Sequence, residues 1–124
     1  MIYLDTHVVI WMYQKDQQRF TQRGYSLIET EDLVISPMVQ LEIEYLFEIK
    51  KITERSSVII DYMRKQIGLH ISDTHFSEVV QRAELLKWTR DPFDRLITAQ
   101  ADLQQASLLT KDGTIHTHYP MAVW

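Results

Sequence analysis

The chain has 124 residues, 45% of them hydrophobic and 24% charged, and it contains no cysteine and no apolar run near the roughly 20 residues of a membrane span. We therefore expect residues 1–124 to form one domain without disulfides, thiolate metal sites or membrane contact, and, because no export signal follows Met1, a cytoplasmic protein. The formal net charge of −4 argues against bulk electrostatic binding of nucleic acid, since phosphate binding relies on lysine and arginine.

Short apolar runs alternate along the chain with longer segments of helical periodicity. The runs that predict strands are 2–4, 33–35, 69–71, 107–110 and, as a fifth, 121–124. Alternation of strands with helices is typical of right-handed βαβ units. The sequence therefore predicts a three-layer α/β/α fold with a central, mainly parallel sheet of four or five strands.

Capping residues define the helices between these strands. Asp5 or Thr6 can cap the first helix, Ser36-Pro37 and Asp91-Pro92 are typical helix starts, and Asp73 or Thr74 precedes another. Residues 14–32 carry a weaker pattern, in which 25–29 fits a short helix. The other predicted helices are 7–12, 36–51, 56–66, 76–87 and 91–105.

Four acidic residues lie where such a sheet would bring distant segments together. Asp5 follows the first strand, Asp112 follows the fourth, and Glu42 and Asp94 lie on the helices that begin at Pro37 and Pro92. Ligands of open parallel sheets bind beyond the carboxyl ends of the strands. Carboxylates gathered there repel one another, and a divalent cation relieves that repulsion. The pattern therefore predicts a metal-dependent site.

Glu42 is the most informative of the four. At about 100° per residue it falls inside an apolar stripe, where an ionised carboxylate needs a partner or a metal. The alternative is a glutamate at the edge of the stripe or paired with arginine. Ile43 and Phe47 form a second apolar pair, which is predicted to contact either the core or another chain. The stripe comprises Met38, Leu41, Tyr45, Leu46, Ile49 and Ile52.

The remaining acids also have structural explanations. Asp91 is a good N-cap, and an acid at Asp94 suits the helix dipole, although Asp94 shares a face with Ile97 and Ala101 and so points inward. Asp5 could be no more than the cap of the helix that follows it, and Asp112 with Gly113 is a common turn pair. Taken together, the acids fit a common site better than chance placement.

Histidines and basic residues near the acids have open roles. His7 can reach the site or simply lie on the first helix, while His116 and His118 lie in a predicted loop and are a poor zinc site without further ligands. The basic residues that flank the acids can contact substrate phosphates or remain solvated, and they are Arg90, Arg95 and Lys111.

Four segments, in this order and spacing, resemble the PIN-domain proteins and more closely their VapC-type toxin ribonucleases. The most specific is 90–101, with Arg90-Asp91-Pro92-Phe93-Asp94-Arg95; the others are 2–7, 36–43 and 108–112. The resemblance implies an endoribonuclease that depends on Mg²⁺ or Mn²⁺, is the toxin of a type II toxin–antitoxin module, is inhibited by a cognate antitoxin and is usually a homodimer.

Matched residue by residue, the resemblance assigns the metal and catalytic acids to Asp5, Glu42, Asp94 and Asp112. It assigns supporting roles to Thr6, Thr110 and Asp91. The Ile43–Phe47 face, together with the helix over 56–66, is then predicted to contact a second copy or the antitoxin. Oxygen-only ligands select hard cations such as Mg²⁺ or Mn²⁺, which would activate a water for attack on the scissile phosphate.

Other classes of protein remain as alternatives. A haloacid dehalogenase-type phosphatase also begins with a strand and an aspartate, but His7 stands where that class needs a second aspartate, and a receiver domain lacks its acidic pair. The main alternative is a catalytically inactive PIN-like module that binds RNA or protein.

Overall fold

The computed structural model describes residues 1–124 and contains one five-stranded sheet in which every pair of neighbouring strands is parallel. The strand order is β3-β2-β1-β4-β5, so the first strand lies at the centre. All five predicted strands are present. Their bounds are β1 (Ile2–Leu4), β2 (Leu33–Ile35), β3 (His70–Ile71), β4 (Ser107–Leu109) and β5 (Ala122–Val123).

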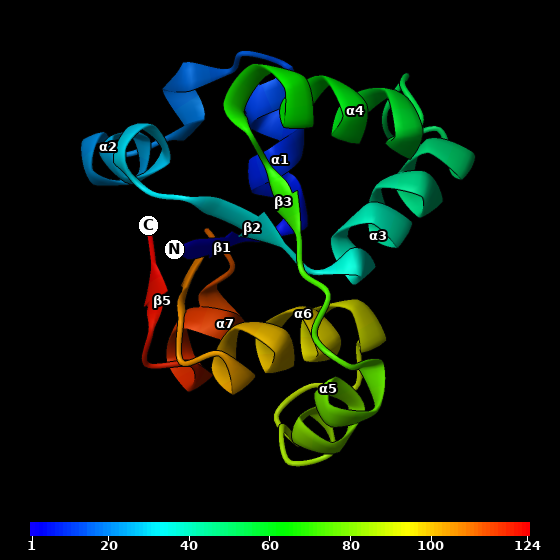
Figure 1. The fold of residues 1–124 in the computed structure, drawn as a ribbon, viewed down its shortest axis with the longest axis vertical. Helices are drawn as coiled ribbons and strands as arrows, with labels where there is room; N and C mark the ends of the chain where they lie inside the picture. Colours follow the sequence, from blue (N-terminus) through cyan, green and yellow to red (C-terminus); the bar gives the residue numbers. More distant parts are fainter.

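Helices cover both faces of the sheet, which confirms the predicted three-layer α/β/α fold (Figure 1). In this view α1, α2 and α4 lie on one side of the sheet, and α5, α6 and α7 on the other. The bounds are α1 (Thr6–Tyr13), the 3₁₀ turn η1 (Gln17–Arg19), α2 (Gln22–Thr30), α3 (Pro37–Glu48), α4 (Ser56–Ile67), α5 (Phe76–Ala83), α6 (Pro92–Leu103) and α7 (Gly113–His118). No helix is long and apolar enough to cross a membrane.

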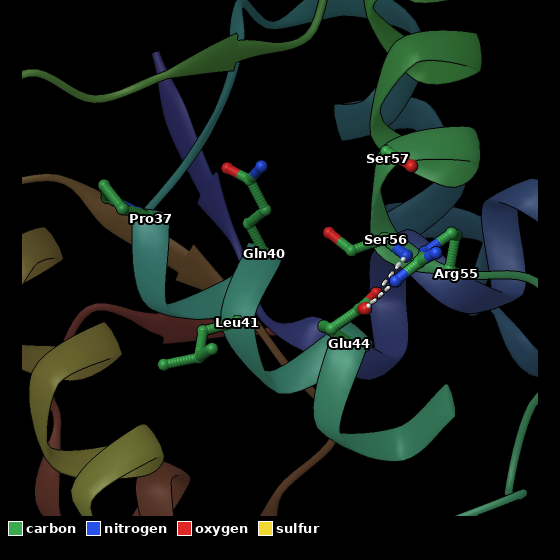
Figure 2. A pocket seen from close by; sticks show the side chains of 7 residues that line it. All are labelled: Pro37, Gln40, Leu41, Glu44, Arg55, Ser56 and Ser57. Carbon is green, nitrogen blue, oxygen red and sulfur yellow. Dashed lines mark hydrogen bonds and ion pairs between the residues drawn. The ribbon is translucent and has the colours of Figure 1, made fainter. Parts of the chain in front are cut away.

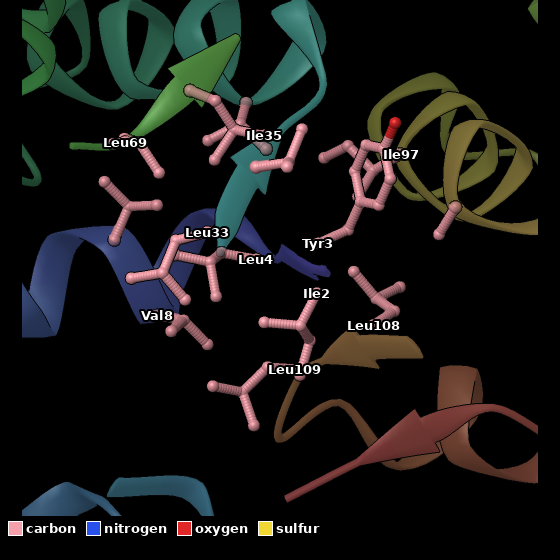
Figure 3. Packing of buried hydrophobic residues seen from close by; sticks show 14 of the residues in the cluster. Ile2, Tyr3, Leu4, Val8, Leu33, Ile35, Leu69, Ile97, Leu108 and Leu109 are labelled. Atoms are coloured by element: carbon pink, nitrogen blue, oxygen red, sulfur yellow. The ribbon is translucent and has the colours of Figure 1, made fainter. Parts of the chain in front are cut away.

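The core lies on both faces of the short strands because side chains alternate along them. Figure 3 shows Tyr3 directed towards Ile97 of α6, while Leu4 and Leu33 lie near Val8 of α1. Each of these five side chains is at most 3% exposed. The buried first strand fixes the position of Asp5, which follows it directly.

The predicted helix starts are confirmed where a side chain caps the backbone. Ser36 accepts a hydrogen bond from the Met38 amide, and Asp91 accepts bonds from the amides of Phe93 and Asp94. The predicted cap of α5 is wrong. His75 holds that position, because the Thr74 hydroxyl is instead engaged by Ser72 and Gln104.

Several boundaries differ from the prediction. Helix α3 ends at Glu48 rather than Lys51, because Lys50 adopts a left-handed conformation with φ of 63°. Helix α5 ends at Ala83, four residues before the predicted end. The weakly patterned 14–32 region contains α2, which is longer than expected and capped by Thr21.

The segment with His116 and His118 is also different, because it forms α7 instead of a loop. Asp112 caps this helix, so its pairing with Gly113 marks a helix start and not a hairpin turn. The short distance to β5 leaves room for only six helical residues, too few to give a clear periodicity.

The predicted core stripe of α3 is only partly correct, because Met38, Leu46 and Ile52 pack against the core but Leu41 is 55% exposed and Tyr45 46% exposed. The fully buried residues of this helix are Val39 and Ile43. The helix is apolar on more than one side, so periodicity alone did not identify the centre of its buried face. Ile43 is therefore unavailable as a contact surface, and Arg55 lies over the half-buried ring of Phe47.

Candidate metal-dependent site

Asp5 is held rigidly at the carboxyl end of β1. One carboxylate oxygen accepts a hydrogen bond of 2.8 Å from the Thr6 amide and thereby caps α1. The other accepts a bond of 2.6 Å from the Thr110 hydroxyl at the end of β4. The residue is 3% exposed. Asp5 is thus both a helix cap, as one explanation predicted, and the centre of a buried polar network.

The Thr110 hydroxyl links Asp5 to Asp112. It donates to Asp5 and accepts from the Asp112 amide at 3.0 Å, so both capacities of a fully buried hydroxyl are used. The Asp112 carboxylate accepts a bond from the Ile115 amide at the start of α7. Adjacent parallel strands β1 and β4 therefore bring two of the predicted acids to one edge of the sheet.

Glu42 joins the same network from α3. Its carboxylate accepts a hydrogen bond of 2.5 Å from the Thr6 hydroxyl, directly after Asp5. Burial raises the pKa of Glu42, the Thr6 hydrogen bond opposes this, and the charges of Asp5 and Asp91 raise the pKa further. The predicted inward orientation of Glu42 is therefore correct, although it depends on Thr6 and not on the proposed apolar stripe.

Asp94 is the most perturbed of the four acids. Its carboxylate accepts no hydrogen bond from the protein. The free amides at the start of α6 donate to the Asp91 carboxylate instead. Burial raises the pKa of Asp94 to about 7, and the nearby charges contribute in the order Asp5, Asp91, Asp112 and Glu42. The charges of these four neighbours therefore all act on Asp94, which lies within electrostatic reach of the other predicted acids.

His7 lies beside Asp5 and resolves one of the open alternatives. Its Nε2 accepts a hydrogen bond of 2.9 Å from the Lys111 amide, and Nδ1 lies 3.6 Å from an Asp5 oxygen. Burial lowers the pKa of His7, although Asp5 and Asp112 oppose the shift. His7 therefore ties the segment that carries Asp112 to the start of α1. Its position directly after Asp5 and Thr6 was the only signal in the sequence.

The predicted substrate-binding residues occupy different positions. Lys111 is exposed next to the site, and Arg90 is exposed just before α6. Arg95 instead donates to the carbonyls of Ala83 and Glu84, which ties α6 to α5. Of the distant histidines, His116 contacts the Thr110 carbonyl and His118 stacks on Trp88.

The donor chemistry of the acids suits a hard divalent cation, since every candidate ligand is a carboxylate oxygen. Burial and neighbouring carboxylates raise the pKa of both Asp94 and Glu42, so the ionised forms of these two side chains would gain from a nearby positive charge. No group of three His, Asp or Glu side chains is arranged to hold one metal ion in this structure. Asp5, Glu42, Asp94 and Asp112 supply the carboxylates that could hold such an ion.

The hollow between α3 and α4 is separate from these acids. It has a volume of about 420 Å³, and Gln40, Leu41 and Glu44 of α3 line it opposite Arg55 and Ser56 (Figure 2). Glu44 accepts hydrogen bonds from Arg55 and from the Ser56 amide, so its charge joins the two helices. None of the four acids lines this hollow, and we assign it no catalytic role.

Comparison with known proteins gives consistent results. The family model for the PIN domain matches residues 2–118. Ribonuclease VapC22 of Mycobacterium tuberculosis is 25% identical, over 99% of this chain and 98% of its own. Two solved structures share the fold across the whole chain. VapBC2 of Rickettsia felis, bound to a promoter DNA fragment, has a TM-score of 0.68, 21% identity and 98% of its chain covered. A toxin–antitoxin complex from Klebsiella pneumoniae has a TM-score of 0.69, 16% identity and 97% covered.

Proposed function

The chain belongs to the PIN domain family, and on that premise we propose that it is an endoribonuclease, dependent on Mg²⁺ or Mn²⁺, that serves as the toxin of a type II toxin–antitoxin pair. Its relative from Mycobacterium tuberculosis is named as a ribonuclease, and the two structures of similar fold are toxin–antitoxin complexes. We expect it to act on RNA in the cytoplasm.

The observation that carries this proposal is the hydrogen-bond network that links three acidic residues at the end of β1: Thr6 connects Glu42 to Asp5, and Thr110 connects Asp112 to Asp5. The raised pKa of Asp94, which burial and these neighbouring carboxylates cause, supports the proposal, because perturbed groups are frequent at functional sites. Asp5, Glu42, Asp94 and Asp112 would hold the metal. When bound, the ion supplies a water of lowered pKa and positive charge at the scissile phosphate.

The residues around the acids have positioning roles in this proposal. Thr110 and Thr6 orient the carboxylates of Asp5 and Glu42 through short hydrogen bonds. His7 holds the backbone of Lys111, whose ammonium group is then free to contact a phosphate. Arg90 is exposed and offers a second such contact.

Partner proteins have a different surface available. Exposed apolar side chains occur on α3, at its C-cap and on the neighbouring α4, and they are Leu41, Tyr45, Ile49, Val58 and Tyr62. Exposed apolar residues that share two neighbouring helices are typical of protein contacts. We propose that this surface, in place of the predicted Ile43–Phe47 face, contacts a second copy of the chain or the antitoxin.

The test is cleavage of total RNA by the wild type and by Asp5→Asn, with Mg²⁺, Mn²⁺ or EDTA. Asparagine retains the helix cap, so the fold should persist while cleavage is lost. Asp61→Asn, on the exposed face of α4, is the matched control and should cleave normally. Products should carry 5′-phosphate and 3′-hydroxyl ends. Retardation of RNA without cleavage by the wild type would instead identify a catalytically inactive binding module.

A further inference from the structure

An aromatic hollow of about 200 Å³ lies between α1, η1 and α2, one helical turn along α1 from His7. Trp11, Phe20 and Tyr25 line it, together with apolar atoms of Met12 and Ile28. Asp16 and Gln17 add polar groups to the lining. Drug-sized ligands occupy pockets of about 300–1,000 Å³, so this hollow suits a single flat ring.

The aromatic lining continues to the acid site. The ring centroid of Trp11 lies 4.7 Å from that of His7, whose Nδ1 is 3.6 Å from Asp5. Trp124, which follows β5, joins Trp11 and Phe20 at centroid distances of 5.8 and 5.3 Å. The tilted pair of Trp11 and His7 therefore connects the hollow to Asp5.

Cations gather around the same rings in a chain whose net charge is −4. The Arg19 guanidinium lies 4.9 Å from the Trp11 centroid, and the Lys111 ammonium lies 5.9 Å from it. Asp16 pairs with Arg19 at 2.9 Å, whereas Lys111 has no acidic partner within 4 Å. Positive charge beside aromatic faces complements a nucleic acid strand, which alternates phosphates with flat bases.

We propose that this hollow binds one unpaired nucleobase of the RNA substrate, adjacent to the phosphodiester that the acid site cleaves. The inference rests on the proposed ribonuclease function and adds a subsite for substrate selection. The base stacks on the aromatic lining, and Lys111 contacts the phosphate between the two sites. The amide of Gln17, held only by a long 3.5 Å contact to the Tyr25 hydroxyl, can hydrogen-bond the edge of the base and so favour some bases over others.

The experiment combines a missing base with a missing ring. Single-stranded oligonucleotides that span a mapped cleavage site carry one abasic residue at successive positions, and KM and kcat are measured with Mg²⁺. The variant is Tyr25→Ala, because Tyr25 is 37% exposed and its loss spares the core. Tyr25→Phe retains the ring, and Phe76→Ala, an exposed aromatic residue of α5, is the control.

With the intact oligonucleotide, Tyr25→Ala should raise KM roughly 5- to 100-fold, the range of one base–aromatic stack, while kcat changes little. Phe76→Ala should behave as the wild type, and Tyr25→Phe, which keeps the ring but loses the hydroxyl contact with Gln17, should reverse most of the KM increase of Tyr25→Ala. At one position next to the cleavage site, the abasic substitution should raise KM for the wild type but not further for Tyr25→Ala.

Two results would overturn the inference while the proposed function stands. One is cleavage of the intact oligonucleotide with equal KM for wild type and Tyr25→Ala. The other is an abasic substitution that, at every position, raises KM by the same factor in Tyr25→Ala as in the wild type. If Tyr25→Ala weakened only the capture of a partner protein, the hollow would belong to a protein contact. Failure of the wild type to cleave any RNA would overturn the proposed function itself, and this inference with it.

Discussion

Asp5 and Asp94 are both proposed metal ligands, but the protein holds their side chains in opposite ways. Asp5 is 3% exposed and accepts hydrogen bonds from Thr6 and Thr110, so its orientation is fixed by two segments of the chain. Asp94 is half-buried, accepts no hydrogen bond and has its pKa raised to about 7. The Asp5 carboxylate is thus stabilised by hydrogen bonds within the fold, whereas the Asp94 carboxylate is partly buried without such bonds.

This difference indicates how the proposed site divides stability and function. Hydrogen bonds offset the cost of burying Asp5, so its network contributes to the fold as well as to any metal. The ionised Asp94 carboxylate has no such hydrogen bonds, so it destabilises the metal-free protein, and a bound cation would remove that destabilisation. Substitutions at the two ends of the site should therefore affect activity and stability in different proportions.

The largest expected effect is the loss of activity in Asp94→Asn. Removing a group that merely orients a metal ligand costs about 10- to 100-fold, so removing a ligand charge should lower kcat for RNA cleavage by more than about 100-fold. Circular dichroism should show an unchanged fold, because Asp94 has no hydrogen bond to lose. Asp102→Asn, on the same helix but paired with Arg82, is the control. Near-normal cleavage by Asp94→Asn would remove Asp94 from the site.

A smaller effect, shared between activity and stability, is expected for Thr110→Val. This change removes the donor to Asp5 and the acceptor for the Asp112 amide and leaves both partners in a buried setting. Unsatisfied buried groups cost about 1–3 kcal/mol, which urea denaturation can measure, and cleavage should fall by about 10- to 100-fold. Thr110→Ser retains the hydroxyl and should recover most of both. Wild-type stability in Thr110→Val would show that the network is not structural.

The positions of most of the predicted acids along the fold could be inferred from the sequence. The acids that follow strands, Asp5 and Asp112, are located by the strand pattern, and Asp94 is located by the Asp91-Pro92 helix start. Thr110 was assigned only a supporting role by resemblance, because its hydrogen bond to Asp5 spans 105 residues and leaves no local signal.

The features that the sequence did not predict correctly are those that tertiary packing determines. Helix α3 is apolar around most of its circumference, so its core-facing side depends on where α1, α4 and α6 pack, and periodicity could not select Val39 and Ile43 over Leu41 and Tyr45. In the same way, nothing local distinguishes Trp11 and Trp124 as neighbours of the acid site from ordinary core residues. Arg95 was predicted to contact substrate phosphates or to remain solvated, and nothing local in the sequence indicated its hydrogen bond to the Ala83 carbonyl of α5.

The smallest expected effect is on the pH dependence of stability in the absence of metal. An unfolded aspartate titrates near pH 3.9, whereas Asp94 in the folded protein titrates near pH 7. Between these values the folded state binds more protons than the unfolded state, so the contribution of Asp94 to the free energy of unfolding falls as pH rises from about 4 to about 7 and is constant above. The raised pKa of Glu42 acts in the same direction, and the lowered pKa of His7 acts oppositely, since it disfavours the folded state as pH falls.

The difference in unfolding free energy between wild type and Asp94→Asn isolates the Asp94 contribution, because Glu42 and His7 are present in both. Measured by urea denaturation in EDTA, the wild type should lose about 1–2 kcal/mol relative to the variant between pH 4.5 and pH 8, a value reduced from the full linkage effect because solvent screens a half-buried charge. Saturating Mg²⁺ should abolish or reverse this trend, since a bound cation favours the ionised carboxylate. A difference that stays constant with pH would mean that Asp94 carries no uncompensated charge, and the contrast with Asp5 would then disappear.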